Sequence, residues 1–368
     1  MRGDIAPDEA RGPAAGKAAG PFFVPRPGVV PRRHFLRYSS LAQAMFWRKK
    51  KASSGPPVVG CFGKLPATGD FIRHNAGGDE IAAWDRWLGA SMDFLQRSLG
   101  NGFDAAYQPA VGIFILRGDA RGDELPARGL VGAWAASADN AGRRYPMTVF
   151  ASYDYQQLVS AGGALPIALW PLITQAYETA TTGRAWPVDK FIEAVSRIEA
   201  PSLEDPDAAS RAYRQWLAGN SMKALWETGF GSDASRYWVL SSLIESIEPF
   251  RGSELPQTGL AVRLPLGAGD AFAMSVWMDL ILRLTASKQT LLNTFWTPRQ
   301  TALIHLGPPH VASFRELLAP TGSAEHVAEL CGLPTVDEET AKKRLQRQHE
   351  SLVARTDQSI AQFLDSIG

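Results

Sequence analysis

The sequence is poor in the residues from which metal and redox sites are built. It contains two cysteines, Cys61 and Cys331, which lie too far apart to form a metal or redox motif, and so low a count suits a reducing compartment. Cys61 falls in an apolar run, where a free thiol usually acts as a small buried side chain. The six histidines show no metal-ligand spacing. We therefore expect no metal, no disulfide framework and no cofactor.

Long apolar segments are also scarce. The basic start of the chain is followed by proline and glycine rather than by an apolar core, so it does not have the pattern of a secretory signal. Residues 271–284 form the longest candidate membrane segment, but Asp279 and Arg283 interrupt it, and it is shorter than the ~20 apolar residues of a membrane span. This segment predicts a buried helix.

Charge of one sign dominates only at the N-terminus. The formal net charge is +1, yet residues 1–54 hold eleven Lys and Arg against three Asp and Glu, which leaves −7 for the rest of the chain. An acidic body argues against nucleic-acid binding. Residues 1–54 are rich in Ala, Gly, Pro and Arg without periodicity, which predicts a disordered basic tail. Residues 45–51 are a solvated part of this tail or, alternatively, a basic aromatic patch that makes peripheral contact with a membrane.

Two stretches with the character of loops carry charge. An apolar run at 58–62 is followed by Gly63, Pro66 and Gly69, which predicts a buried strand that ends in a tight irregular loop. Residues 137–146 form a second charged stretch that is again punctuated by glycine and proline. We predict that the two loops lie side by side, and that Asp70 of the first pairs with Arg143 of the second through the bidentate geometry that arginine favours.

Together with a helix between them, these stretches resemble the TagF/ImpM accessory proteins of type VI secretion. The pattern of that family is Gly-Lys-Leu-Pro-x-x-Gly-Asp-Phe, then Trp-Asp-x-Trp-Leu, then Ser-x-Asp-x-x-Gly-Arg-x-Phe-Pro. This chain has the first motif at 63–71, the second at 84–88 and the third at 137–146, with Tyr145 where the family usually has Phe. The resemblance covers residues 56–182.

The resemblance implies a cytoplasmic protein without enzymatic activity, free or at the inner face of the membrane with the secretion complex. Such a protein acts by binding, as a post-translational and mostly negative regulator of assembly or firing. The partners implied are a forkhead-associated scaffold protein or other cytoplasmic secretion components. The motif positions marked as candidate binding residues are Gly63, Lys64, Pro66, Gly69, Asp70, Phe71, Arg73, Trp84, Asp85, Trp87, Ser137, Asp139, Gly142, Arg143, Arg144 and Pro146.

Two alternative functions are also compatible with the motifs. A phosphate- or metal-binding hydrolase could use Asp70 and Asp139 as carboxylates and Lys64, Arg143 and Arg144 as anion-binding cations. The sequence lacks the Ser or Thr that follows the lysine of a phosphate-binding loop, and it lacks a Gly-x-Ser-x-Gly turn. The chain could instead be a structural subunit of the secretion apparatus, which sequence alone does not distinguish from a regulator.

The sequence predicts an α+β fold with a mixed, largely antiparallel sheet flanked by helices. Apolar residues recur every three or four positions over 79–99, which indicates one helix. Strand-like runs at 111–116, 130–136 and 145–153 and a helix at 166–181 complete a β-α-β-β-β-α unit. Residues 187–250 are predicted to be a helical segment. Residues 257–320 repeat the strand, helix, strand, strand order, which predicts a second, smaller α/β half that packs on the first or extends its sheet.

The last segment, 335–368, is predicted to be one amphipathic helix. Thr335 and Glu338 fit a capping box at its start. Apolar residues between Leu345 and Ile367 recur at intervals of about seven positions. This apolar stripe either folds back on the body or meets a partner, and we expect that it folds back.

Overall fold

The computed structural model describes residues 55–118, 125–204, 207–253, 259–267, 271–287, 290–297 and 301–367. All of them belong to one compact unit, which spans Lys50–Gly368. The predicted basic tail at 1–54, with its alternative of membrane contact at 45–51, lies outside the described residues.

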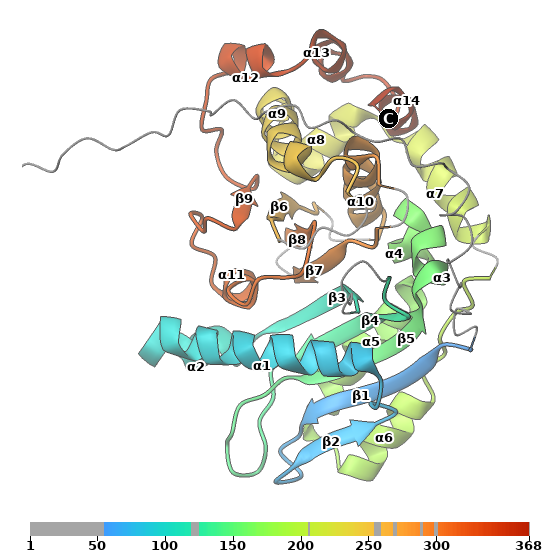
Figure 1. Ribbon diagram of the computed structural model, residues 1–368, viewed down its shortest axis with the longest axis vertical. Helices are drawn as coiled ribbons and strands as arrows, with labels where there is room; N and C mark the ends of the chain where they lie inside the picture. The colour runs from blue at the N-terminus through green and yellow to red at the C-terminus, as the bar shows by residue number, and fades with distance from the viewer. Residues whose placement is uncertain are drawn as a thin grey trace, which may run out of the picture. The chain divides into compact units, whose positions relative to one another are not determined.

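One nine-stranded sheet runs through the described part of the chain (Figure 1). Its order is β2-β1-β5-β4-β3-β7-β8-β6-β9, and all neighbours are antiparallel except β6 and β9. The predicted α+β class with a mixed, largely antiparallel sheet is confirmed. The strands are β1 (Val58–Lys64), β2 (Phe71–His74), β3 (Val111–Arg117), β4 (Arg128–Ala135), β5 (Met147–Asp154), β6 (Ala261–Pro265), β7 (Asn293–Thr297), β8 (Thr301–His305) and β9 (Val327–Glu329).

The second half of the chain extends the sheet of the first. Strand β3 pairs with β7 through three residue pairs, Ile113 with Trp296, Phe114 with Phe295, and Ile115 with Thr294. Of the two arrangements considered from the sequence, sheet extension is therefore the one that the structure adopts. Strands β2 and β9 were not predicted, because runs of four and three residues are too short to show an alternating pattern.

Side chains on the central strands alternate between two hydrophobic cores, one on each face of the sheet. Successive strand residues point to opposite faces, so neighbours in the sequence enter different cores. From these strands the first core receives large aromatic side chains, among them Phe62, Phe114, Trp134, Phe150 and Phe295. The second contains their smaller neighbours, among them Cys61, Ile113, Ala133 and Val149. Cys61 is thus a small buried side chain, as predicted, and burial raises the pKa of its thiol to about 12.

Helices cover both faces of the sheet. The first core is closed by α1 (Asp79–Leu99), α2 (Phe103–Tyr107) and α11 (Ser313–Leu318). Helix α1 has the predicted bounds, with two acidic residues in its first turn and Gly100 at φ 49° as its C-cap. The helices on the second face are α3 (Tyr155–Ser160), α4 (Leu165–Ala168), α5 (Trp170–Thr182), α6 (Val188–Ser196), α7 (Asp207–Gly219), α8 (Met222–Phe230), α9 (Arg236–Ile247) and α10 (Ala271–Thr285).

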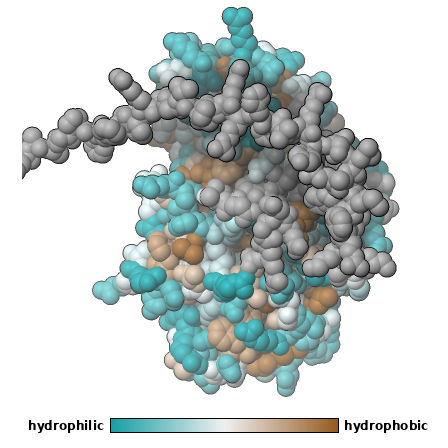
Figure 2. All heavy atoms as spheres, in the orientation of Figure 1, coloured by the Kyte–Doolittle hydropathy of each residue, from teal (hydrophilic) through white to brown (hydrophobic). Residues whose placement is uncertain are grey.

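The helical segment predicted at 187–250 corresponds to α6 to α9 with a short 3-10 turn at Glu248–Phe250. Helix α10 is buried against the second core, as predicted for the longest apolar segment. Within the ranges that the structure describes, no helix has both the length and the apolarity of a membrane span. In the view of Figure 2, hydrophilic side chains surround separate hydrophobic patches, and of the described large hydrophobic residues only Val58 and Leu333 are exposed.

The prediction of one long C-terminal helix is wrong. The segment forms three short helices, α12 (Glu338–Arg344), α13 (Arg347–Ala354) and α14 (Ile360–Ile367). The extended backbone of Leu345 ends α12, and Asp337 rather than Thr335 caps it by accepting a hydrogen bond from the N–H of Thr340. The breaks let all the apolar positions of the predicted stripe turn inward, so they are buried in the second core. The expectation that the stripe folds back is therefore confirmed, although its helical continuity is not.

Candidate functional site

The two charged loops lie side by side, as predicted. Strands β1 and β5 are antiparallel neighbours, so the loop after β1 and the loop before β5 meet at the same end of the sheet. The N–H of Asn140 donates to the carbonyl of Thr68 at 2.9 Å. The Nη2 of Arg143 donates to the carbonyl of Gly69 at 2.5 Å. These contacts join the loops through backbone as well as side chain.

Asp139 is the centre of the contact between the loops. Its Oδ2 accepts hydrogen bonds from Lys64 Nζ at 2.8 Å and from Arg143 Nε at 2.7 Å. Its Oδ1 accepts from the backbone N–H groups of Ala141 at 3.0 Å and Arg143 at 2.9 Å. The side chains of Asp139 and Lys64 are 0% and 8% exposed, whereas that of Arg143 is 64% exposed. The carboxylate is thus enclosed, with both oxygens in use.

The environment keeps Asp139 ionised. The hydrogen bond from Lys64 holds the pKa of this carboxyl well below its usual range, and the backbone and side chain of Arg143 act in the same direction against the opposing effect of desolvation. A carboxylate with such a low pKa and four donors around it is a poor proton acceptor. Its geometry is that of a structural anchor.

The predicted pairing of Asp70 with Arg143 is wrong. Asp70 is exposed and its Oδ1 accepts a hydrogen bond from the N–H of the next residue, Phe71, at 2.7 Å. Arg143 lies four positions after Asp139 in the same turn, where its Nε reaches that carboxylate, and its Nη2 points to the carbonyl of Gly69. The ion pair between the loops is therefore the reverse of the predicted one. The first loop supplies the cation, Lys64, and the second supplies the carboxylate, Asp139.

Glycine is needed at two of the motif positions. Gly63 has φ +145°. A Cβ there would lie 2.2 Å from the carbonyl oxygen of Pro146, the last residue of the second loop before β5. Gly142 has φ +81°, in the region that side chains rarely adopt. Gly63 thus permits the close approach of the loops, and Gly142 permits the turn that brings Arg143 back to Asp139.

Phe62, Phe71 and Tyr145 form an aromatic cluster that packs against the first loop. The ring of Phe71 stacks on Phe62, with centroids 5.4 Å apart, and meets the ring of Tyr145 edge to face at 4.9 Å. The hydroxyl of Tyr145 donates to Asp85 Oδ1 at 2.7 Å, and burial, with a further contribution from Asp85, raises the pKa of that hydroxyl. Arg73 lies over Phe62 and 3.6 Å from Asp85. The hydroxyl of Tyr145, which the family's usual Phe would lack, thus ties the second loop to α1.

The two tryptophans of the helical motif have different structural roles. Trp84 is fully buried, stacks on Phe114 and donates from Nε1 to Thr148 Oγ1 at 3.1 Å. Trp87 stacks on Phe295 at 4.9 Å and donates from Nε1 to the carbonyl of His310 at 3.3 Å. Trp84 therefore fixes α1 to β3 and to β5, the strand that follows the second loop, and Trp87 fixes α1 to the other half of the sheet.

The part of the chain that carries the site matches a known protein family. Residues 60–198 match the family model described as TagF N-terminal domain, Type VI secretion system-associated. The chain contains a TagF N-terminal domain. All the candidate residues lie within this TagF domain, and the matched residues also include α6. The association with type VI secretion that the motifs predicted is confirmed.

A search of solved structures matched the crystal structure of PA0076 from Pseudomonas aeruginosa PAO1. The sequence identity is 25%, the match covers 39% of this chain and 64% of that chain, and the TM-score is 0.33. The chain thus spans somewhat less than two thirds of the length of that solved chain. No curated protein matches the sequence.

A pocket of about 400 Å³ lies beside the loops of the TagF domain. Pro66, Ser137 and Arg144 line it from the motifs, and Tyr107 and Arg184 line it from outside them. The N–H of Ser137 donates to the hydroxyl of Tyr107 at 3.1 Å, and that hydroxyl donates to the carbonyl of Ser137 at 2.9 Å. Tyr107 and Arg184 were not predicted from the sequence, because neither lies in a charged loop or shares a spacing with the motifs. Only the folded chain brings them to Ser137.

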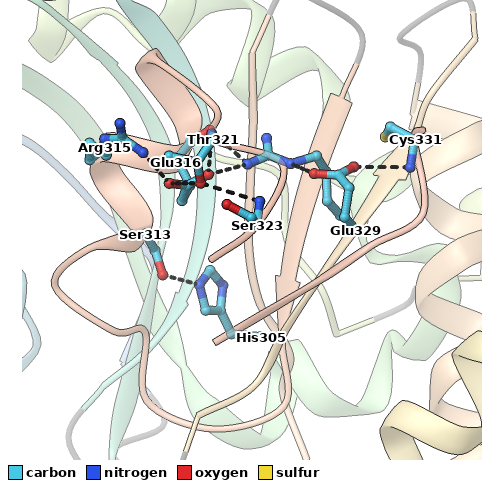
Figure 3. Close-up of polar contacts among 9 residues, drawn as sticks. His305, Ser313, Arg315, Glu316, Thr321, Ser323, Glu329 and Cys331 are labelled. Atoms are coloured by element: carbon cyan, nitrogen blue, oxygen red, sulfur yellow. Dashed lines mark hydrogen bonds and ion pairs between the residues drawn. The ribbon is translucent and has the colours of Figure 1, made fainter. Parts of the chain in front are cut away.

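A second polar cluster lies outside the TagF domain, in the other half of the sheet (Figure 3). His305 Nε2 and Ser313 Oγ are 2.9 Å apart, as in a nucleophile and its base, but both side chains are buried, and burial lowers the pKa of His305 to about 3. Nearby, Arg263 lies between Glu316 at 3.2 Å and Glu329 at 2.7 Å. His305 is thus a hydrogen-bonded core residue, and the contacts of this cluster join α11 to β6, β8 and β9.

Proposed function

We propose that this protein is an accessory factor of type VI secretion that acts by binding, as a post-translational regulator that restrains assembly or firing of the machine. The observation that carries the proposal is the way in which the TagF motifs use their charges. Lys64, Asp139 and Arg143 satisfy one another, so the motif chemistry is used to hold two loops in one fixed shape. A fixed loop shape is what a binding surface requires, because little ordering entropy is then lost on association.

The proposed contact surface is the exposed part of these loops, which we call the motif-loop surface. It consists of Pro66, Asp70, Gly142 and Arg143, which are exposed, and Arg144, which is half-buried. The surface presents both signs of charge, which favours a specific orientation of the partner over simple adhesion. We propose a forkhead-associated scaffold protein, or another cytoplasmic component of the secretion machine, as the partner.

The same geometry argues for binding over turnover. A hydrolase built on the motifs would use Asp70 and Asp139 together, as a general base or as ligands of a metal-bound phosphoryl group. Asp139 already accepts hydrogen bonds from Lys64, Arg143 and two backbone N–H groups, and Asp70 binds the N–H of Phe71. The closed set of contacts thus supports the non-enzymatic proposal.

Gene deletion with complementation tests the proposal in the native host. A regulator predicts raised or mistimed secretion on deletion, restored by the wild-type gene. The variants Asp70→Ala and Arg143→Ala should fail to restore control and fail to co-purify with the scaffold protein while retaining a normal melting curve. The matched control is Arg197→Ala, an exposed arginine paired with Glu193 at the end of α6. If deletion instead abolishes secretion and the protein co-purifies in fixed ratio with the assembled machine, it is a structural subunit.

A further inference from the structure

The pocket beside the motif loops combines apolar walls with two arginines. Pro66, Ala136, Ala138 and Ala185 contribute the apolar lining, and Arg144 and Arg184 contribute the cations. At about 400 Å³ the pocket is within the usual size range of small-ligand sites. Residues 55–368, to which the pocket belongs, carry a net negative charge. Two arginines at one pocket therefore make it locally positive on an otherwise acidic part of the chain.

Arg184 is a half-buried cation without a carboxylate partner among the described residues. Its Nε donates to the carbonyl of Thr181 at 3.2 Å, at the end of α5, and its Nη1 donates to the carbonyl of Ala136 at 2.8 Å. These two neutral acceptors fix the guanidinium in place but leave its formal charge uncompensated. The second terminal nitrogen, Nη2, has no hydrogen-bond acceptor in the part of the chain that the structure describes.

Arg144 contributes a second fixed guanidinium. Its Nε donates to Asp104 Oδ1 at 3.1 Å, and this carboxylate balances its charge. Both terminal nitrogens of Arg144 have no acceptor among the described residues. The two arginines and Asp104 together leave one positive charge at the pocket, which one carboxylate would neutralise.

We propose that this pocket binds a carboxylate on a short aliphatic stem. The carboxylate accepts from the unused terminal nitrogens of Arg184 and Arg144, since guanidinium groups match carboxylate oxygens in geometry. The stem packs on Pro66 and the alanines. The same chemistry is present in a small free carboxylic acid and in the side chain of a glutamate on another protein. The proposal does not depend on the regulatory function, because the pocket would bind either source in a protein with another role.

Ligand-detected NMR titration of the full chain tests the pocket with defined probes. Butyrate should bind saturably, and its neutral counterpart butyramide should bind about tenfold more weakly or worse, since charged hydrogen bonds are lost. Arg184→Ala should weaken butyrate binding by about tenfold or more, while the control Arg197→Ala should leave it unchanged. Equal binding of butyrate and butyramide, equal binding by wild type and Arg184→Ala, or no saturable binding of butyrate would overturn the proposal, as would stronger binding of inorganic phosphate than of butyrate.

A second variant, Arg144→Ala, keeps the test valid if Arg184→Ala does not fold. A pair of peptides then shows whether the carboxylate comes from a partner protein or from a small free acid. Arg144→Ala removes a half-exposed ion pair, which costs little stability, and should also weaken butyrate binding. The peptides are N-acetyl-Gly-Glu-Gly-amide and its Gln counterpart. Tighter binding of the Glu peptide than of butyrate, with the Gln peptide weaker, supports a partner protein as the source. Tighter binding of butyrate than of the Glu peptide supports a small free acid.

Discussion

Lys64 and Asp139 stand 75 positions apart in the sequence and form an ion pair of 2.8 Å with almost no solvent exposure on either side chain. Burial removes the water that would otherwise solvate each charge, so each group depends on the other. Arg143 binds the same carboxylate from the solvent side, where water can replace it. Because of this difference in exposure, we expect Lys64 to contribute more than Arg143 to the stability of the contact between the loops.

We expect Lys64→Met to destabilise the protein by about 3–5 kcal/mol, because the loss of one partner leaves a buried charge without its main counter-ion. Methionine retains the length of the stem, so packing is nearly preserved. Arg143→Ala should cost about 0–1 kcal/mol, as is usual for an exposed pair. Urea denaturation of both variants at pH 7 measures the difference. Equal costs would mean that burial does not distinguish the two contacts.

Gly63→Ala tests the close approach of the loops. The added methyl group would meet the carbonyl of Pro146 at 2.2 Å, and the φ of +145° is unfavourable to alanine, so we expect a loss of about 2–3 kcal/mol. The matched control is Gly102→Ala, where φ is −81° and the site is open, and there the stability should be unchanged or rise by about 0.4–1 kcal/mol. Thermal denaturation compares the two. A neutral Gly63→Ala would show that the second loop moves away without cost.

His305 gives the stability of the protein a pH dependence in a defined window. Its pKa falls from its ordinary 6.5 to about 3 in the folded state, chiefly because burial disfavours the charged ring. The unfolded chain therefore takes up a proton between these values that the folded chain refuses, and stability declines as pH falls from about 6.5 toward 3.

In His305→Gln this contribution should be missing, so the unfolding free energy should depend less on pH over that window, by at most about 1.4 kcal/mol per pH unit. Urea titrations at several pH values between 4 and 7 measure the slopes, and carboxyl groups contribute alike to both proteins. Parallel curves for variant and wild type would contradict the burial of a neutral imidazole.

The folded-back C-terminus predicts a large effect from a residue near the end of the chain. Phe363 in α14 is buried in the second core, so Phe363→Ala should cost about 3–5 kcal/mol. The exposed Ser366 of the same helix is the control, because its replacement by alanine should change stability by less than about 0.5 kcal/mol. Were the stripe a docking face for a partner instead, both substitutions would be mild in the isolated protein.

The sequence was most informative where a pattern is long or a backbone constraint is strict. Helix α1 shows its periodicity over 21 residues and ends at a glycine, so its bounds could be predicted. The position of the motif loops followed from glycine and proline. Strand β2 was missed because four residues carry no period, and the single C-terminal helix was predicted because a seven-residue interval does not reveal where the backbone turns.

The ion pairing within the site could not be derived in the same way. The charges of the two stretches predicted that the loops lie side by side, but the choice between Asp70 and Asp139 depends on which carboxylate is enclosed, and only the packed structure determines that. Tyr107 and Arg184 reach the pocket through long-range contacts with the 136–138 backbone. Such contacts leave no local trace in a sequence, because each depends on the path of the whole chain.

The pairing of β3 with β7 has a consequence for any attempt to isolate the TagF domain. A fragment that stops at residue 198 lacks β7, so β3 would present the unpaired backbone groups of Ile113 to Ile115 at a free sheet edge, and Trp87 would lose Phe295. An exposed apolar edge of this kind is a template for self-association through strand pairing. We therefore expect a fragment that ends at residue 198 to be less soluble than the full chain, because the strand that covers this edge lies almost a hundred residues later in the sequence.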